Sequence, residues 1–375
     1  MRSIVKLVIC IIALSSCAND PTPQKDVDWK KIDLKTTTDL QKVFFVNSSV
    51  GFIGGTQRAT LSAFTNKNID GGYFEYVESV HINTDSVKYL YKTFSANNPE
   101  PTLFITRDGG NSWTSLATPF VSSITDIFFL DELVGYVATE YEGVHKTTDG
   151  GKTWKSVISN IGFLGNQRIV ENPFNEVYFL SKMEGFAFKQ YNNIVVKTID
   201  GGASWTVVSS FDLKYVNGGG LKSMTFPFDN LTGYGVGNSH LVKTVNGGLS
   251  WDTLHFKLPA FLDQNILSNI QDLSFLDENI AFMICGGIAY ISRDGAVNWE
   301  RIDFSSGDRI QAINENECYV LSHGNPPIAF ANVSSGKYAS MTIDRGETQI
   351  NDWFFADGKG FAVGPNGLLL KYERN

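Results

Sequence analysis

The chain has 375 residues, of which 42% are hydrophobic and 19% are charged, so it can bury a substantial core and does not belong to the disordered class. Its formal net charge of −8 argues against nucleic-acid binding, because neutralising phosphates requires an excess of Lys and Arg. This length fits either two average domains or one large all-β domain.

Residues 1–16 are typical of a bacterial lipoprotein signal peptide. Arg2 and Lys6 precede an apolar run that is too short to be a good membrane span, and the tetrapeptide LSSC (14–17) follows in the order of a lipobox. We therefore predict lipid attachment at Cys17, a polar tether over residues 17–27, and a lipid-anchored location in the bacterial cell envelope, periplasmic or surface-exposed. An ordinary secretory signal with an incidental Cys17 is the alternative.

The other two cysteines after the signal peptide are Cys285 and Cys318. An oxidising compartment would permit a disulfide between them. Each lies inside an apolar, strand-like run, which is more typical of a small buried side chain, and spacing does not decide between these readings. No metal-ligand spacing such as CxxC is present, so we expect neither a metal nor a cofactor.

An eight-residue motif occurs five times, as TRDGGNSW (106–113), TTDGGKTW (147–154), TIDGGASW (198–205), TVNGGLSW (244–251) and SRDGAVNW (292–299). Successive tryptophans are 41, 51, 46 and 48 residues apart, which is the spacing of an array of supersecondary units. Each copy lies between two β-rich runs and suits a self-contained hairpin turn. The Asp or Asn can accept from amides two or three residues on, a glycine supplies positive φ, and the Trp covers the turn.

This interpretation assigns structural roles to the acidic or amide residue and the tryptophan of each copy. Five catalytic or metal-binding copies are not needed, and each acidic side chain is already occupied by its own turn. The residues concerned are Asp108, Trp113, Asp149, Trp154, Asp200, Trp205, Asn246, Trp251, Asp294 and Trp299.

The motif resembles the Asp-box, or BNR, repeat of β-propellers. The fourth copy has Asn246 for Asp and the fifth has Ala296 for the second glycine, and both changes still allow the turn. The longer segments 123–154 and 221–251 resemble the propeller of photosystem II stability and assembly factors, and the resemblance covers roughly residues 28–375. It implies a role in assembling a membrane complex.

The strand rhythm predicts an all-β, seven-bladed β-propeller over residues 28–375, with four-stranded antiparallel blades. Five blades end at Asp boxes, a sixth over 309–343 lacks the box, and a seventh over 349–375 supplies only three strands. The stretch DWKKI (28–32) reads as the missing fourth strand, which would close the ring and leave no open blade. Six blades, with residues 28–32 as the end of the tether, is the alternative.

Propeller topology predicts two unlike faces. The turns between the first and second strands of a blade lie with the Asp boxes on one face, and the remaining connections lie on the other. The largest of these is an insertion at 56–101 in blade one, where residues 81–94 alternate enough to form an extra β-ribbon. Aromatic residues on these connections are predicted to anchor a protein or glycan partner, unless each packs beneath its own loop: Tyr73, Phe74, Tyr141, Phe163, Phe211, Tyr215, Phe256 and Phe261.

Asp-box propellers include sialidases and some glucan hydrolases, so an enzyme is a possible alternative. A sialidase needs three converging arginines, and only Arg58 and Arg168 fall plausibly on the loop-rich face. A glycoside hydrolase needs two facing carboxylates, for which the loop-rich face offers Glu142, Glu184, Asp212 and Asp263. The preferred prediction is a non-enzymatic, envelope-anchored binding or scaffold lipoprotein that assists assembly of a membrane or surface complex. A glycoside hydrolase or glycan-binding protein is the alternative.

Overall fold

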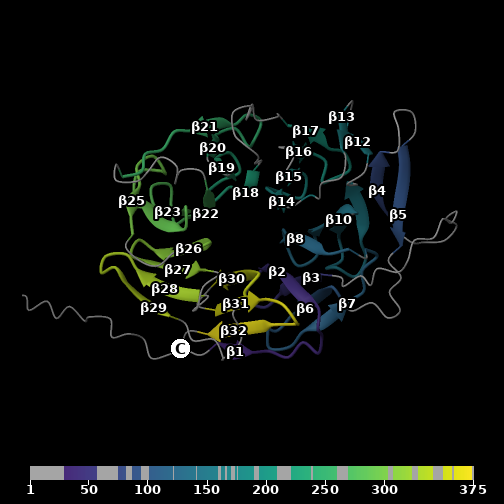
Figure 1. The fold of residues 1–375 in the computed structure, drawn as a ribbon, viewed down its shortest axis with the longest axis horizontal. Helices are drawn as coiled ribbons and strands as arrows, with labels where there is room; N and C mark the ends of the chain where they lie inside the picture. Colours follow the sequence, from purple (N-terminus) through teal and green to yellow (C-terminus); the bar gives the residue numbers. More distant parts are fainter. Residues whose placement is uncertain are drawn as a thin grey trace, which may run out of the picture.

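A computed structural model shows seven four-stranded antiparallel sheets arranged in a ring, so the chain is a seven-bladed β-propeller (Figure 1). The predicted fold class is confirmed, and the six-blade alternative is wrong. The structure describes residues 29–373 apart from 57–74, 82–86, 94–100, 121, 141, 159–161, 165–166, 170–173, 175, 190–193, 209–220, 238–239, 260–268, 303–306, 323–327, 341–348 and 357–358. Within this part of the chain there is no helix of the length and apolarity that crossing a bilayer requires. The predicted signal peptide and tether lie outside the described residues.

Each blade runs from an inner strand at the channel to an outer strand at the rim. Blade one contains β2 (Asp39–Phe45), β3 (Gly51–Thr56), β6 (Leu103–Thr106) and β7 (Thr114–Leu116). Blade two contains β8 (Ile124–Phe129), β9 (Gly135–Thr139), β10 (Gly143–Thr147) and β11 (Lys155–Ile158). Blade three contains β14 (Glu176–Phe179), β15 (Gly185–Lys189), β16 (Ile194–Thr198) and β17 (Thr206–Val207). Blade four contains β18 (Leu221–Thr225), β19 (Gly233–Gly237), β20 (Leu241–Thr244) and β21 (Asp252–Leu254).

The remaining blades follow the same order, including the sixth, which has no Asp box. Blade five contains β22 (Ile270–Phe275), β23 (Ala281–Cys285), β24 (Ile288–Ser292) and β25 (Glu300–Arg301). Blade six contains β26 (Arg309–Asn314), β27 (Glu317–Leu321), β28 (Ile328–Asn332) and β29 (Lys337–Ser340). Blade seven contains β30 (Asp352–Ala356), β31 (Lys359–Val363), β32 (Leu369–Glu373) and β1 (Lys30–Lys31).

Two small hairpins stand outside the blades. The first pairs β4 (Glu75–His81) with β5 (Val87–Thr93) inside the long insertion of blade one, and the second pairs β12 (Gly162–Leu164) with β13 (Gln167–Ile169) between blades two and three. The predicted ribbon at 81–94 is therefore present but begins earlier. Its first strand starts at Glu75 because Glu75 pairs with Thr93 at the open end of the hairpin.

The ring is closed by the N-terminal strand, as predicted. β1 pairs antiparallel with β32, with Lys30 opposite Lys371, and the Ile32 amide donates to the Leu369 carbonyl at 2.8 Å. Trp29 is only 4% exposed, and its ring lies 5.6 Å from the rings of both Phe355 and Tyr372. This strand removes the open edge that a three-stranded last blade would leave.

Aromatic stacking joins neighbouring blades. At six of the seven junctions, an aromatic residue on the second strand of one blade packs against an aromatic residue at the end of the next blade's inner strand, with centroids 3.5–5.7 Å apart. Five of these pairs are stacked, and Tyr234–Phe275 is tilted at 33°. The pairs are Phe361–Phe45, Phe52–Phe129, Tyr136–Phe179, Phe186–Phe226, Tyr234–Phe275 and Tyr319–Phe355. Stacked pairs of this kind contribute about 0.5–1.5 kcal/mol beyond the area they bury.

A glycine makes room for the inner aromatic ring of its own blade. At Gly135, an added Cβ would lie 2.3 Å from a carbon of the Phe129 ring, which is closer than any real contact. The second strands of most blades begin with the dipeptide GF or GY, in which the aromatic residue is the one that packs against the next blade. The close approach of the inner ring explains why a glycine precedes it.

The two cysteines pack as buried side chains in separate strands and form no disulfide. Cys285 lies in β23 and Cys318 in β27, and both are fully buried. Burial raises the pKa of the Cys318 thiol to about 12. The prediction of small buried side chains is confirmed and the disulfide is wrong.

Substitution of Trp29 tests the closure. Trp29→Ala removes a buried indole from the junction of β1 and blade seven, so we expect the free energy of unfolding to fall by about 3 kcal/mol, measured by urea denaturation. Lys30→Ala is the control, because Lys30 is exposed in the same strand. Equal stability of Trp29→Ala and wild type would show that the N-terminal strand does not hold the ring closed.

Candidate functional site

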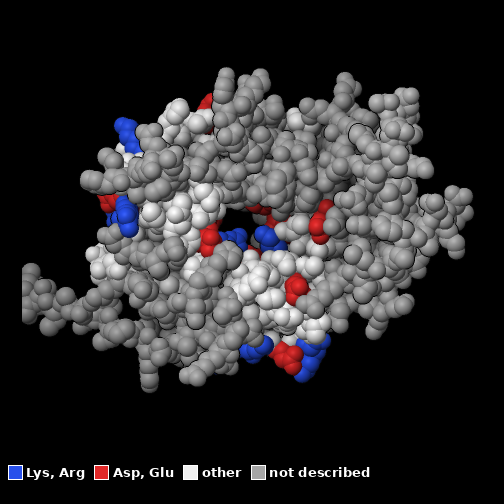
Figure 2. Space-filling model, viewed as in Figure 1, with Lys and Arg blue, Asp and Glu red and all other residues white. Residues whose placement is uncertain are grey.

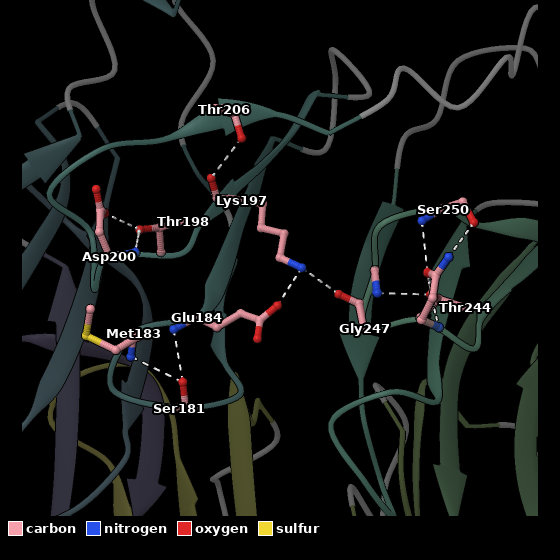
Figure 3. A network of polar contacts seen from close by, with 12 residues as sticks. Ser181, Met183, Glu184, Lys197, Thr198, Asp200, Thr206, Thr244, Gly247 and Ser250 are labelled. Carbon is pink, nitrogen blue, oxygen red and sulfur yellow. Dashed lines mark hydrogen bonds and ion pairs between the residues drawn. The ribbon is translucent and has the colours of Figure 1, made fainter.

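The five Asp-box turns share one pattern of hydrogen bonds, which Figure 3 shows for the fourth box, from Thr244 to Ser250. The hydroxyl of the first Thr or Ser accepts from the amide four residues on, at 2.8–3.1 Å. The Oδ1 atom of the Asp or Asn also accepts from the amide four residues on, at 2.8–3.0 Å. The expected bond three residues on is present in the first box, where Asp108 Oδ1 also accepts from the Asn111 amide at 3.0 Å. The bond four residues on was not expected, and it forms because two successive residues with positive φ widen the turn. In the fifth box Ala296 adopts this conformation, with φ 69°.

These bonds leave the Asp-box carboxylates poorly suited to acid–base chemistry. Hydrogen bonds from Thr153 lower the pKa of Asp149 to about 2, and hydrogen bonds from Ser204 do the same for Asp200. Trp154 also donates to a carbonyl within its own turn, that of Gly151, at 3.1 Å. The geometry supports the structural role proposed for these motifs.

The Asp boxes also bind the turns beside them. In every box, the first glycine donates its amide to a carbonyl in the turn between the first and second strands of the same blade, at 2.7–2.9 Å; the acceptors are Ser49, Leu133, Met183, Leu231 and Asn279. Both kinds of turn therefore lie on one face of the ring, which we call the Asp-box face. The connections that remain, including both small hairpins, emerge on the opposite, loop-bearing face.

Sequence reasoning missed a lysine that links one blade to the Asp box of the next. Lys197 in β16 is 4% exposed, and its Nζ donates to the Gly247 carbonyl of blade four at 2.8 Å and pairs with Glu184 at 2.5 Å (Figure 3). Its ammonium also lies 5.2 Å from the centroid of the Phe186 ring.

The same link recurs at one other junction, and a related link to a side chain of the Asp box occurs at another. Lys146 donates to the Gly201 carbonyl at 2.6 Å, and Lys371 donates to Asn111 Oδ1 at 2.7 Å. The Asp box is therefore not self-contained. For Lys146 and Lys197 the available signal was the Lys-Thr dipeptide at the start of the second and third boxes, but the partner of each lysine lies about fifty residues away in the neighbouring blade.

The loop-bearing face contains the predicted aromatic anchors, of which the structure describes few. Phe163 lies in β12, within a hairpin of its own. Phe256 is half-buried and packs against the core between blades four and five, so at this residue the structure favours packing beneath its own segment. Outside the described residues lie Tyr73, Phe74, Tyr141, Phe211, Tyr215 and Phe261.

The candidate catalytic carboxylates are not brought together by the described residues. Glu184 was expected on the loop-bearing face, but β14 ends at Phe179 and β15 begins at Gly185, so it lies in a turn on the Asp-box face. There it is paired with Lys197. Glu142 does lie on the loop-bearing face, where it accepts a hydrogen bond from Ser122. Asp212 and Asp263 lie outside the described residues.

Charged side chains line the central channel. The inner strands β2, β8, β14, β18, β22, β26 and β30 surround it (Figure 1), and Figure 2 shows acidic and basic side chains around the opening. Lys42 Nζ lies 3.8 Å from Asp126 Oδ1, and Arg309 pairs with Asp352.

Most of these carboxylates hold the neighbouring blade rather than face free solvent. Each accepts a backbone amide from the next inner strand: Asp126 from Val177 at 2.9 Å, Glu176 from Met224 at 3.3 Å, Asp272 from Ile310 at 2.9 Å and Asp352 from Val43 at 3.0 Å. Burial raises the pKa of Glu176 to about 8, and the negative charge of Asp126 adds to this. Burial also raises the pKa of Asp126 and Asp272.

No group of three or more His, Cys, Asp or Glu side chains with metal-binding geometry occurs among the described residues. The channel charges are arranged as amide acceptors and ion pairs, which is a structural use of these groups. The candidate functional site is therefore a face of the ring.

Comparisons with known proteins follow the fold. Residues 105–215 match the family model described as photosynthesis system II assembly factor YCF48. The photosystem II assembly lipoprotein Ycf48 of Synechococcus sp. (strain CC9902) is 26% identical over 172 residues, which span 43% of this chain and only 50% of that relative.

Two solved structures share the fold over nearly their whole length. YCF48 bound to D1 peptide has a TM-score of 0.60 at 17% identity, covering 95% of this chain and 98% of that one. YCF48 from Cyanidioschyzon merolae has a TM-score of 0.62 at 15% identity, covering 92% and 98%. At these identities the structural likeness shows the fold alone.

The channel carboxyl Glu176 predicts a pH dependence of stability. Folded Glu176 keeps its proton up to about pH 8, whereas the unfolded chain releases it near the ordinary value, so stability falls as pH rises between the two. Glu176→Gln retains an acceptor for the Met224 amide. We expect it to reduce the loss of unfolding free energy between pH 5 and pH 8 by at least about 1 kcal/mol, measured with urea. The exposed Glu278→Gln is the control, and an unchanged pH slope in Glu176→Gln would contradict the prediction.

Proposed function

We propose that this chain, an Asp-box propeller of the photosystem II assembly factor-like kind, is a non-catalytic binding protein that holds a segment of a partner protein while a membrane complex is assembled. The observation that carries the proposal is the match of residues 105–215 to the assembly-factor family. It is supported by the shared fold of a relative solved with a D1 peptide bound.

The loop-bearing face is the proposed site of partner binding. Both small hairpins emerge there, β4–β5 from blade one and β12–β13 from the connection between blades two and three. Among the described residues neither hairpin pairs with a third strand. A strand edge without a partner strand can accept an extended peptide by main-chain hydrogen bonds, with side-chain pockets supplying specificity.

Anchoring through lipid at Cys17 is part of the same proposal. A relative that is 26% identical over its matched segment is a lipoprotein, and this chain places a lipobox before a polar tether over residues 17–27. The tether joins the lipid to a single propeller domain over 28–375, which would keep the ring close to a bacterial membrane while leaving it free to reorient.

Partner capture on the loop-bearing face can be tested by substitution. We expect the triple variant Tyr73→Ala, Phe163→Ala, Phe261→Ala to recover at least about tenfold less of each cross-linked envelope partner than wild type, because aromatic anchors supply most of the affinity at such surfaces. Recovery is measured by quantitative mass spectrometry after cross-linking in native membranes. Lys152→Gln, on the Asp-box face, is the control.

Two results would contradict this part of the proposal. The first is unchanged capture by the triple variant. The second is release of sugar from a glycan panel by the wild-type chain that is lost in Glu142→Gln, which would establish a glycoside hydrolase.

Lipid attachment is tested by metabolic labelling with an alkyne fatty acid. We expect label on the wild-type chain and none on Cys17→Ser, because only the lipobox cysteine receives the acyl chains. Cys318→Ser should stay labelled, since that thiol is buried in β27. Equal labelling of wild type and Cys17→Ser would exclude Cys17 as the attachment site.

A further inference from the structure

Exposed apolar side chains gather on the Asp-box face. Eight large apolar residues are exposed in the described part of the chain, and every one lies in an Asp box or in the turn bonded to it, within blades two to five. They are Leu133, Met183, Ile199, Leu231, Val245, Leu249, Leu276 and Val297. Exposed apolar residues that are scattered singly need no explanation, but a grouping on one face marks an interaction surface.

The strongest part of this grouping spans blades three and four. We call it the apolar patch, and its members are Met183, Ile199, Leu231, Val245 and Leu249, which are 56–72% exposed. At the positions equivalent to Val245 and Leu249, box one has Arg107 and Asn111, and box two has Thr148 and Lys152. The turn accepts polar residues at both positions, so its geometry does not require the apolar ones.

The apolar patch is held as one rigid surface. The Met183 carbonyl accepts from the Gly201 amide at 2.7 Å, and the Leu231 carbonyl accepts from the Gly247 amide at 2.9 Å. Lys197 then joins the two blades through Glu184 and Gly247 (Figure 3). A surface fixed before binding loses little conformational entropy when a partner docks.

The surroundings of the patch are acidic. The turns of blades two to five on this face contain nine acidic and three basic residues: Asp131, Glu132, Asp149, Glu184, Asp200, Asp229, Asp277, Glu278 and Asp294 against Lys152, Lys182 and Arg293. The ammonium groups of Lys146 and Lys197 also reach these turns, so nine acidic residues stand against five basic ones. Of the basic residues, Lys182 is already paired with Asp131 at 2.7 Å. Like charges would oppose a second copy of this face or an anionic lipid surface, and they favour a partner that brings positive charge.

We propose that the apolar patch docks a second protein partner whose contact surface presents apolar side chains bordered by Lys and Arg. This goes beyond partner capture on the loop-bearing face, because the two surfaces lie on opposite sides of the ring. A propeller with both surfaces can hold two proteins at once, which is what a scaffold requires.

The test compares two synthetic peptides. One has an apolar face of Leu and Phe bordered by Lys and Arg, and its matched partner has Glu at each basic position. Binding is measured by fluorescence anisotropy to a lipid-free chain from residue 18, which keeps every described residue of the closed ring. We expect the basic peptide to bind at least about tenfold more tightly than the acidic one, and added salt to weaken it.

The patch variant takes its residues from equivalent turns of blades one and two. Leu231→Ser, Val245→Thr and Leu249→Asn reproduce Ser49, Thr148 and Asn111, so the turns should fold unchanged. We expect this triple variant to bind the basic peptide at least about tenfold more weakly, because it can no longer bury two leucines and a valine when the peptide docks. The control Thr148→Ser with Lys152→Gln should bind within about twofold of wild type.

Several outcomes would overturn the proposal. These are equal affinity for the two peptides, unchanged affinity of the patch variant, self-association of the wild-type chain in sedimentation that the variant abolishes, or binding to phosphatidylglycerol vesicles that the variant abolishes. The loop-face variant of Tyr73, Phe163 and Phe261 should bind the basic peptide normally. Failure of this proposal is therefore distinguishable from failure of the proposed function.

Discussion

The structure depends on aromatic stacking between neighbouring blades. A four-stranded sheet of this size cannot bury both of its faces alone, so each blade is stable only against the next. Pairs such as Tyr136 with Phe179 supply this contact at six junctions. At the seventh junction, between blades five and six, the inner strand of blade six ends at Asn314, which is not aromatic. Aliphatic side chains around Phe282 and Ile310 fill this junction instead. Because the chain must close on itself for every blade to have a neighbour, Trp29 completes the same system at the N-terminus.

Closure determines where function can reside. The inner strands bring carboxylates to the channel, but those of Asp126, Asp272 and Asp352 accept hydrogen bonds from backbone amides of the next blade. The Asp boxes use their carboxylates within their own turns, and lysines such as Lys197 use their charge to join blades. The polar groups at the centre and at the turns are therefore largely committed to holding the ring. What remains for binding is the side chains that these turns and connections present outward on the two faces.

The fold was predictable because its signals are local. The Asp-box motif marks a turn within eight residues, and DWKKI carries the tryptophan that packs into the last blade, so both the blade count and the closure followed from the sequence. The Lys197 link was not found because its partner, Gly247, lies in another blade. Glu184 was placed on the wrong face because the end of β14 was not located. The apolar patch had a sequence signal in Ile199, Val245 and Leu249, but only their exposure in the folded chain distinguishes such residues from core residues.

The fourth Asp box connects this architecture to the proposed docking surface. Asn246 replaces the usual aspartate, yet its Oδ1 accepts the Ser250 amide at 3.0 Å and its Nδ2 donates to the Ser250 hydroxyl at 2.9 Å, so the turn is made as in the other boxes. Turn geometry therefore does not explain why this box lacks a carboxylate. Docking does, because a charge at the centre of an apolar contact would have to be stripped of water, whereas an amide with both polar atoms bonded costs far less. The uncharged box lies between Val245 and Leu249, each 67% exposed, where an apolar contact would be centred.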